Sequence, residues 1–361
     1  MNSIDDSEIK ARLLAYLARV CDQPDIAYAA GPDRISGGRD AAIFGFELSP
    51  APARVSGPLI LRLARKPDPM RVRLEAIVYT TLAAMNYPVP LVAVTEPDAA
   101  VLGGPFMVMT RLAGRPLADQ VDAVGKAQSL VGEMRRLLSL PAIVGGITAT
   151  WIDVQIQLHE LPTQPLLQAL AAAGMDANLV TFDGQLKRLG AVIEQYRLDG
   201  LKPGLSWLVS SYPQGPSSMA ICHGDFHPLN ILADHGRVTG IIDWENVVIA
   251  PPEMDVGSAL ANIATVPFGG PPLLRPVVRA LVWFLLRKYL RGYRRRRPLD
   301  DAAISYFQVF RAMAQLAAVG RSLAEGQAGG AFQSEAGVRN LIAHIHGLTG
   351  LEPRLELSQG I

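Results

Sequence analysis

The sequence lacks the features that would mark a secreted, membrane-embedded or nucleic-acid-binding protein. It has two cysteines in 361 residues, too few for a disulfide framework, so a reducing compartment is expected. Its formal net charge is +1, which gives no overall field to attract nucleic acid or a membrane surface. Its most apolar stretch, residues 277–289, contains Arg279 and is shorter than the roughly 20 apolar residues of a membrane-spanning helix.

The first residues also lack the basic segment and apolar run that mark a signal peptide. We therefore expect a cytoplasmic protein, with no membrane and no nucleic acid among its partners. What the sequence has in plenty is apolar residues, 49% against 19% charged, which excludes disorder for most of the chain. At roughly 150 residues per domain, the length predicts two domains or lobes.

The chain changes character near residues 110–116. Before this junction, short apolar runs predict a β-rich lobe with one principal helix, Met70–Met85. Strands are expected over residues 43–48, 59–64, 91–95 and 106–109, after a first helix over 6–21. Beyond the junction, helical periodicity covers residues 122–140, 151–173, 178–198, 273–292 and 301–322. The sequence thus predicts an α+β protein with a small lobe over residues 1–110, built on a five-stranded antiparallel sheet and a helix, and a larger helical lobe over residues 111–361.

The most informative segment lies between Met219 and Asp255. Short apolar strands alternate there with polar residues: Asp225 follows one strand, Asn230 precedes the next, and Asp243 ends a third. Asp243 stands 18 residues after Asp225, a spacing over which a β-hairpin can fold back and bring the three oxygen-bearing side chains together. Taken singly, each of the three is an ordinary turn residue.

Two carboxylates and an amide, without thiolates, are typical ligands of a hard cation such as Mg²⁺. Phosphoryl transfer uses that chemistry. One carboxylate orients and deprotonates the attacking hydroxyl, and an Asp and an Asn hold the metal ions that bridge the phosphates. The pattern typical of such enzymes is H-x-D-x-x-x-x-N followed by an Asp at a strand end. It is present here as His223 to Asn230, followed by Ile241-Ile242-Asp243-Trp244-Glu245.

This segment resembles the aminoglycoside phosphotransferase and choline-kinase-like family, whose members share the bilobal fold of protein kinases. The similarity rests on the HGD-x-x-x-x-N and I-I-D-W-E motifs with Asp255 downstream, and weaker agreement extends over about residues 28–320. It implies an ATP- or GTP-dependent phosphotransferase that uses Mg²⁺ and transfers the γ-phosphate to a hydroxyl of a small molecule. A P-loop enzyme is excluded, because the sequence has no G-x-x-x-x-G-K-[ST] motif.

The resemblance also implies roles for individual residues. Asp225 is the expected catalytic base, and Asn230 and Asp243 are the expected Mg²⁺ ligands. Arg62 stands where the family offers a Lys or Arg to the phosphates, with Lys66 as the alternative, and Glu75 would orient it. The other expected nucleotide contacts lie in the small lobe: Ser36, Gly37 and Gly38 over the phosphates, and Met107, Met109 and Arg111 beside adenine.

Two other functions stay open at this point. A nucleotide-binding pseudokinase, acting as an interaction module, would keep the fold, although the intact Asp225, Asn230 and Asp243 speak against it. A metal-dependent hydrolase could bind zinc or iron through four side chains, those of His223, Asp225, His227 and Asp243. This function would leave Pro228 and Asn230 unexplained.

Several residues have a structural alternative to a role in the chemistry. His223 and Asp255 are expected to brace the Asp225 loop through hydrogen bonds, and Glu75 has an ordinary partner in Arg71, four residues earlier. The only run of like charge, Arg294–Arg297, is expected at a solvated helix end. Beyond residue 250, thirteen Lys and Arg stand against eight Asp and Glu, which favours a neutral or anionic acceptor over a polycationic aminoglycoside.

Overall fold

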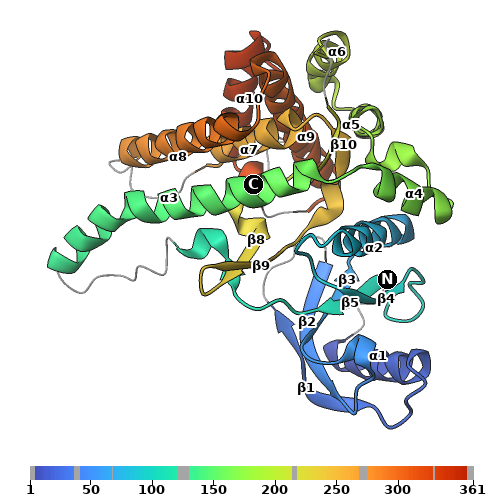
Figure 1. The fold of residues 1–361 in the computed structure, drawn as a ribbon. Coiled ribbons are helices and arrows are strands. Elements are labelled where there is room, and N and C mark those ends of the chain that lie inside the picture. Colours follow the sequence, from blue (N-terminus) through green and yellow to red (C-terminus); the bar gives the residue numbers. More distant parts are fainter. Residues whose placement is uncertain are drawn as a thin grey trace. The chain divides into compact units, whose positions relative to one another are not determined.

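The computed structural model describes residues 5–35, 41–66, 68–120, 130–213, 218–267, 275–327 and 330–355 (Figure 1). The chain forms two compact units, and each gathers segments that are far apart in the sequence. The first unit contains Met1–Leu117, Pro165–Gly174 and Leu229–Glu245, and the second contains Ala118–Gln164, Met175–Pro228 and Asn246–Ile361. The segment with Asn230 and Asp243 therefore packs with the N-terminal strands.

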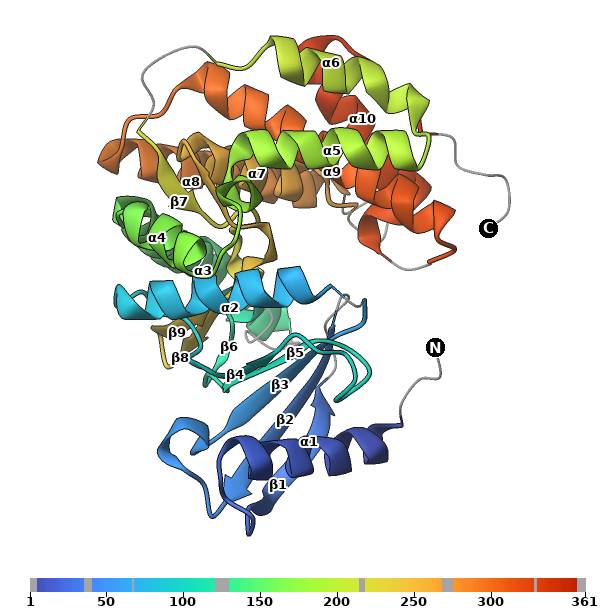
Figure 2. The same cartoon turned by 90° about the vertical axis from the view of Figure 1, so that its right-hand side faces the viewer.

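An antiparallel sheet forms the centre of the first unit (Figure 2). Its strands are β1 (Ala27–Ile35), β2 (Ala41–Ser49), β3 (Leu59–Ala64), β4 (Val92–Glu96) and β5 (Phe106–Thr110), in the spatial order β1-β2-β3-β5-β4. Along β3, Leu59, Leu61 and Leu63 are buried, whereas the residues between them are partly exposed. Because successive side chains of a strand point to opposite faces, the leucines form the core and Arg62 lies on the other face.

Helices α1 (Asp6–Val20) and α2 (Pro69–Ala84) also belong to the first unit. α1 buries one side in a hydrophobic core that it shares with the leucine face of the sheet, through Ile9, Leu13, Tyr16 and Leu17. α2 begins where Asp68 caps its N-terminus: the Asp68 carboxylate accepts a hydrogen bond from the backbone N–H of Arg71 at 3.0 Å. Pro69 follows the cap, at a position where a missing N–H costs nothing.

A hairpin completes the first unit. Its strands β8 (Ile231–Asp234) and β9 (Arg237–Ile241) are antiparallel, and β6 (Arg115–Pro116) pairs with the other edge of β8. The connecting residues His235 and Gly236 both have a positive φ, 45° and 77°, as a two-residue type I′ turn requires. Because Ile231 pairs with Ile241, Asn230 and Asp243 flank the open end of this hairpin.

Helices build most of the second unit. They are α3 (Leu130–Glu160), α5 (Phe182–Gln195), α6 (Lys202–Ser210), α7 (Glu253–Thr265), α8 (Arg275–Arg296), α9 (Asp301–Ala324) and α10 (Glu335–Thr349). α7 is buried along most of its length and packs against α9 and α10, while α3 lies beside α8 (Figure 1). Two short strands, β7 (Ala220–Cys222) and β10 (Val248–Ala250), pair antiparallel next to these helices.

The structure confirms a β-rich N-terminal region and a helical C-terminal region, and it corrects several expected boundaries. The helix expected over residues 122–140 lies partly outside the described residues. The sequence predicts a break at residues 141–150, between two helices, but α3 runs through it. α3 then ends at Glu160, because Pro162 cannot continue a helix, and α4 (Gln164–Ala172) begins separately. The strand-rich residues 220–249 divide between two sheets. No helix in the described part of the chain is both long and apolar enough to cross a membrane.

Candidate active site

One face of α2 supplies the contacts around Asp243. Arg71, Glu75 and Tyr79 are spaced four residues apart and therefore lie on the same side of the helix. Arg71 forms an ion pair with Glu245, and Tyr79 Oη accepts a hydrogen bond from the backbone N–H of Asp243 at 3.1 Å. This side of α2 thus holds the segment that follows β9.

Carboxylates surround Arg62 on β3. Its Nη1 donates a hydrogen bond to Glu75 Oε2, and its Nη2 lies 3.8 Å from both Asp243 Oδ1 and Glu245 Oε2. The pairing of Arg62 with Glu75 agrees with the orienting role predicted for Glu75. The contact of Arg62 with phosphate groups stays a prediction.

Glu75 is a buried carboxylate rather than a solvated one. Only 1% of the residue is exposed, and its Oε1 has no hydrogen-bond partner among the described residues. Arg71, the ordinary partner expected from the sequence, lies 3.9 Å from that oxygen. Burial raises the pKa of Glu75 to about 7, because the attraction of Arg62 and Arg71 does not make up for lost hydration and for the nearby acids.

Asp243 and Asn230 lie at the same end of the β8–β9 hairpin. The backbone N–H of Ile242 donates to the carbonyl of Asn230 at 3.0 Å, which closes this end. Asp243 adopts a φ of +70°, a conformation that costs a non-glycine residue energy. The hydroxyl of Tyr79 stabilises this conformation by accepting a hydrogen bond from the backbone N–H of Asp243. The Asp243 side chain is 44% exposed, so its oxygens are accessible to a ligand.

Asp225 follows β7 in the second unit, and hydrogen bonds to its carboxylate hold it in place. Its Oδ1 accepts hydrogen bonds from Asn262 Nδ2 at 2.6 Å and from Arg311 Nη2 at 2.7 Å, and His227 Nε2 lies 3.5 Å away. Burial alone would raise the pKa of this carboxyl, but Arg311, and then His227 and His223, hold it below its ordinary value. Asp225 is therefore ionised at neutral pH.

A buried carboxylate on α7 holds the backbone of the Asp225 loop. Asp255 accepts hydrogen bonds from the N–H groups of His223 at 2.9 Å and Gly224 at 2.6 Å. Gly224 has a φ of +78°, and a Cβ there would come within 2.2 Å of the Asn246 carbonyl oxygen, so the tight turn requires glycine. His223 Nδ1 accepts a hydrogen bond from the Asp225 N–H at 3.3 Å. The predicted bracing by His223 and Asp255 is confirmed.

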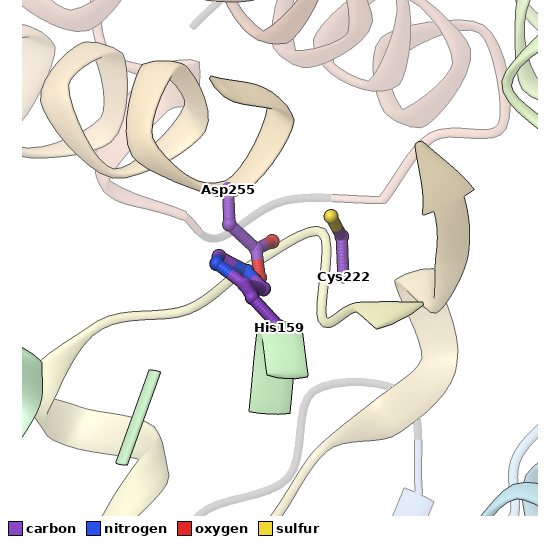
Figure 3. Close-up of side chains that lie close together, drawn as sticks. All are labelled: His159, Cys222 and Asp255. Carbon is purple, nitrogen blue, oxygen red and sulfur yellow. The ribbon is translucent and has the colours of Figure 1, made fainter. Parts of the chain in front are cut away.

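Figure 3 shows the side chains around Asp255, with His159 from α3 and Cys222 from β7 close to its carboxylate. His159 Nε2 lies 3.1 Å from Asp255 Oδ2, and His159 Nδ1 lies 2.6 Å from Tyr293 Oη on α8. His159 thus links α3 and α8 to the helix that holds the loop.

The ligand atoms of His159, Cys222 and Asp255 lie within 4.8 Å of one another, as a metal site would require. Their hydrogen bonds argue for a brace instead, since both oxygens of Asp255 accept backbone N–H groups and both His159 nitrogens have partners. Burial and the nearby Asp255 raise the pKa of Cys222 well above its usual value, so it is a thiol and not the thiolate that binds metals. Within the described residues, His223, Asp225 and His227 form no such metal-binding group.

The residues expected beside adenine lie on and after β5. Met107 and Met109 are buried, and Met107 is the register partner of Arg62. Directly opposite residues of an antiparallel pair share a face, so both methionines lie on the Arg62 side of the sheet. Arg111 follows the strand and reaches over Gly45 of β2, where a Cβ would come within 3.0 Å of its Nη1.

Three further predictions concern the Ser36 turn, Lys66 and the arginine run near residue 294. Ser36, Gly37 and Gly38 lie outside the described residues. Lys66 stands two residues after the end of β3, whereas Arg62 lies within the strand and against Glu75. The arginine run near residue 294 has intramolecular partners, since Arg294 pairs with Asp301 and Arg296 with Asp153.

Comparison with known proteins decides the family. The model of the phosphotransferase enzyme family (APH) matches residues 35–299, most of the chain. The chain belongs to the phosphotransferase enzyme family. The matched range includes four strands of the five-stranded sheet, β2 to β5, together with the Asp225 loop, the β8–β9 hairpin and α7.

Curated relatives match parts of this phosphotransferase. Human acyl-CoA dehydrogenase family member 11 is 27% identical over 199 residues, which covers 53% of this chain and 23% of that protein. The uncharacterized protein YcbJ of Bacillus subtilis is 46% identical over 41 residues, 11% of this chain and 13% of its own length. In each case the match spans less than a quarter of the relative.

Solved structures resemble nearly the whole phosphotransferase chain. A candidate aminoglycoside phosphotransferase from Ralstonia eutropha JMP134 superposes with a TM-score of 0.60 at 19% identity, over 94% of this chain and 96% of that one. The macrolide 2′-phosphotransferase MphH from Brachybacterium faecium gives 0.51 at 16% identity, over 95% and 99%. These similarities show the fold and confirm the predicted protein-kinase-like architecture, and the family-model match confirms the membership that the motifs indicated.

Proposed function

We propose that this phosphotransferase transfers the γ-phosphate of ATP or GTP to a hydroxyl group of a small molecule, with Asp225 as catalytic base and Asn230 and Asp243 as Mg²⁺ ligands. The observation that carries the proposal is the state of Asp225. Its carboxylate is oriented by hydrogen bonds from Arg311 and Asn262 and kept ionised by Arg311 and two histidines, in a family whose reaction needs such a base.

The charges of the first unit support binding of a phosphate–metal group. Three acidic side chains, Glu75, Asp243 and Glu245, face two guanidinium groups, so acidic groups outnumber basic ones in these contacts. Asn230 and Asp243 offer the hard oxygen atoms that Mg²⁺ prefers, and Asp243 is accessible, so the residues fit this ion. When bound, Mg²⁺ neutralises charge on the phosphate oxygens.

Arg62 is the group of this chain that would contact the phosphates directly. Its planar guanidinium can donate to two phosphate oxygens at once, and a lysine could not do this with the same geometry. Glu75 holds one nitrogen of Arg62 and so sets the direction of the others. Met107 and Met109 offer an apolar surface on the same face of the sheet, which suits a purine ring.

Asp225 would act on the acceptor. Its carboxylate accepts a hydrogen bond from the acceptor hydroxyl, orients the oxygen toward the γ-phosphorus and takes the proton as the new P–O bond forms. The bond between the γ-phosphorus and the bridging oxygen breaks, and the nucleoside diphosphate leaves. Asp225 and Asn230 are five residues apart, so the chain itself keeps base and metal ligand within about 18 Å.

Relatives with bound ligands support a nucleotide donor. APH(4)-Ia has been solved with ADP and hygromycin B, at a TM-score of 0.53 and 17% identity, and with AMP-PNP and hygromycin B. An APH(2″) enzyme has been solved with GDP and kanamycin. Adenine and guanine nucleotides are therefore both candidates here. The cytoplasmic location and the absence of nucleic-acid and membrane partners stay predictions.

The proposal is tested by thermal unfolding of the full chain with ATP or GTP, each with and without Mg²⁺, followed by a panel of hydroxylated metabolites and antibiotics screened for nucleoside diphosphate release. We expect stabilisation by one nucleotide that depends on Mg²⁺, and turnover with a neutral or anionic acceptor. Nucleotide binding without turnover across the panel would favour the pseudokinase, and stabilisation by Zn²⁺ alone would favour the hydrolase.

A further inference from the structure

Two helices of the second unit hold the side chain of Asp225 from outside the sequence motif. Asn262 lies on α7, seven residues after Asp255, so the two side chains lie on the same side of that helix, two turns apart. Arg311 lies on α9. Asp255 binds the backbone of the Asp225 loop, and Asn262 and Arg311 bind its carboxylate.

Arg311 and Asn262 form a closed hydrogen-bonded group with the loop. Arg311 Nη2 donates to Asp225 Oδ1 at 2.7 Å, its Nη1 donates to the Gly224 carbonyl at 3.3 Å, and its Nε donates to Asn262 Oδ1 at 2.8 Å. A guanidinium has donors only, so the Asn262 oxygen must face Arg311. The Asn262 amide nitrogen then faces Asp225 and donates to the same Oδ1 at 2.6 Å.

Two donors on one oxygen fix the rotation of the carboxylate. Oδ1 is held from two directions, so the direction of Oδ2 is set as well. The group is shielded from water, because Asn262 is 7% exposed and the Arg311 side chain 12%. In such surroundings charge-assisted hydrogen bonds are stronger than at a surface, and an unpaired polar group is costly.

We propose that Arg311 and Asn262 are positioning residues of this phosphotransferase, which hold the Asp225 carboxylate by one oxygen, in one orientation and with its charge balanced by Arg311. The inference rests on the proposed role of Asp225 as the base. Among the described residues, the groups that face Asp225 include Arg311 from α9, Asn262 from α7, and His223 and His227 from its own loop. Asp255 also lies nearby, with its oxygens engaged by backbone N–H groups.

The two residues have separable effects. Arg311 supplies charge and geometry, whereas Asn262 supplies geometry alone. Without Arg311, the largest charge that opposes the effect of burial is lost, so the pKa of Asp225 rises and the protonated, inactive form appears at a higher pH. Without Asn262 the charge balance stays, and the carboxylate loses one of the two hydrogen bonds that orient it.

The first test needs no acceptor. Protein labelled with ¹³C at the aspartate carboxyl carbons is titrated between pH 4 and 8, and the Asp225 signal is assigned by its loss in Asp225→Asn. We expect this signal to stay constant in the wild type and in the control Arg339→Gln, which removes an exposed arginine paired with Glu335. In Arg311→Gln it should titrate within the range. A signal that stays constant in Arg311→Gln overturns the inference, whatever the reaction turns out to be.

The second test measures turnover, with slow Mg-ATP hydrolysis by water as the probe reaction. Asn262→Ala loses a hydrogen bond to the base, and Arg311→Lys loses the planar fork that joins Asp225, Gly224 and Asn262. Both variants should lower kcat about 10- to 100-fold with little change in KM for ATP. Their Asp225 signals should stay constant between pH 4 and 8. If Arg311→Gln does not fold, these two variants decide the question, and wild-type kcat in both overturns the inference. Absence of hydrolysis in the wild type would count against the proposed function, while the titration still tests Arg311.

Discussion

Glu75 in the first unit and Asp225 in the second are both shielded carboxylates paired with an arginine, yet their pKa values move in opposite directions. Burial raises the pKa of Glu75 to about 7, and its partner Arg62 is also close to Asp243 and Glu245. The pKa of Asp225 is lowered by Arg311 and by two histidines, which outweigh burial. The charges around the ion pair decide the direction, and the presence of a salt bridge alone does not.

This difference suits the two parts of the proposed reaction. The first unit carries more acidic than basic side chains around Arg62, so a cation that binds there relieves repulsion among them. The second unit holds one carboxylate, Asp225, in its ionised form, as the proposed base requires. A base must keep its charge and its orientation, whereas a metal site gains from acids that are not fully neutralised.

The largest expected effect concerns the negative charge of Asp225. Asp225→Asn keeps the shape and hydrogen bonds of the side chain and removes its charge, so kcat should fall about 10²- to 10⁴-fold, the range of general-base catalysis. Initial rates with the identified acceptor would show this, and the dissociation constant of the Mg-nucleotide should change less than about twofold. A variant with wild-type turnover would show that Asp225 is not the base.

The next effect tests the raised pKa of Glu75 through the pH dependence of stability. In the metal-free protein the folded state binds a proton at Glu75 more tightly than the unfolded chain does. The free energy of unfolding therefore falls as the pH rises from 4.5, the ordinary pKa of Glu75, to about 7, its pKa in the folded protein. The loss amounts to about 3 kcal/mol. Glu75→Gln removes it, so the variant should gain stability relative to the wild type across this range.

Urea unfolding at pH 5, 6, 7 and 8 in the presence of a chelator measures that difference. Glu335→Gln, at an exposed position, is the matched control and should show no comparable trend. A Glu75→Gln difference that is the same at every pH would contradict the raised pKa, and with it the contrast to Asp225.

A smaller effect concerns the brace behind the Asp225 loop. His159→Ala leaves the buried Asp255 without one of its partners and should lower the free energy of unfolding by about 2 kcal/mol. Tyr293→Phe removes one hydrogen bond to His159 and should cost about 1 kcal/mol. His235→Ala, at the exposed turn of the β8–β9 hairpin, is the control. If His159→Ala were as stable as this control, the brace would have no energetic role.

The site could be predicted where its residues are close in sequence or follow a periodic pattern. The Asp225 loop, the strand that ends before Asp243, and the pairing of Arg62 with Glu75 could be recognised in this way. The residues that hold Asp225 and Asp255 could not. Arg311 contacts Asp225 from 86 residues away, and His159 contacts Asp255 from 96 residues away.

Both residues stand within long helices, where periodicity indicates a helix and nothing about a partner. Their one signal is the cost of burying a charged or polar group, which requires a hydrogen-bonding partner that only the tertiary structure identifies. The end of α3 had a local signal in Pro162. The passage of α3 through residues 141–150 did not, because packing against other helices overrides weak local propensity there.

The most direct test compares Mg-nucleotide binding to Asp243→Asn and Asp225→Asn by calorimetry, with the nucleotide that stabilises the wild type. We expect Asp243→Asn to weaken binding at least about tenfold in the presence of Mg²⁺, and Asp225→Asn to bind as the wild type does. The opposite result, with affinity lost in Asp225→Asn and kept in Asp243→Asn, would contradict the division of the reaction between the two units.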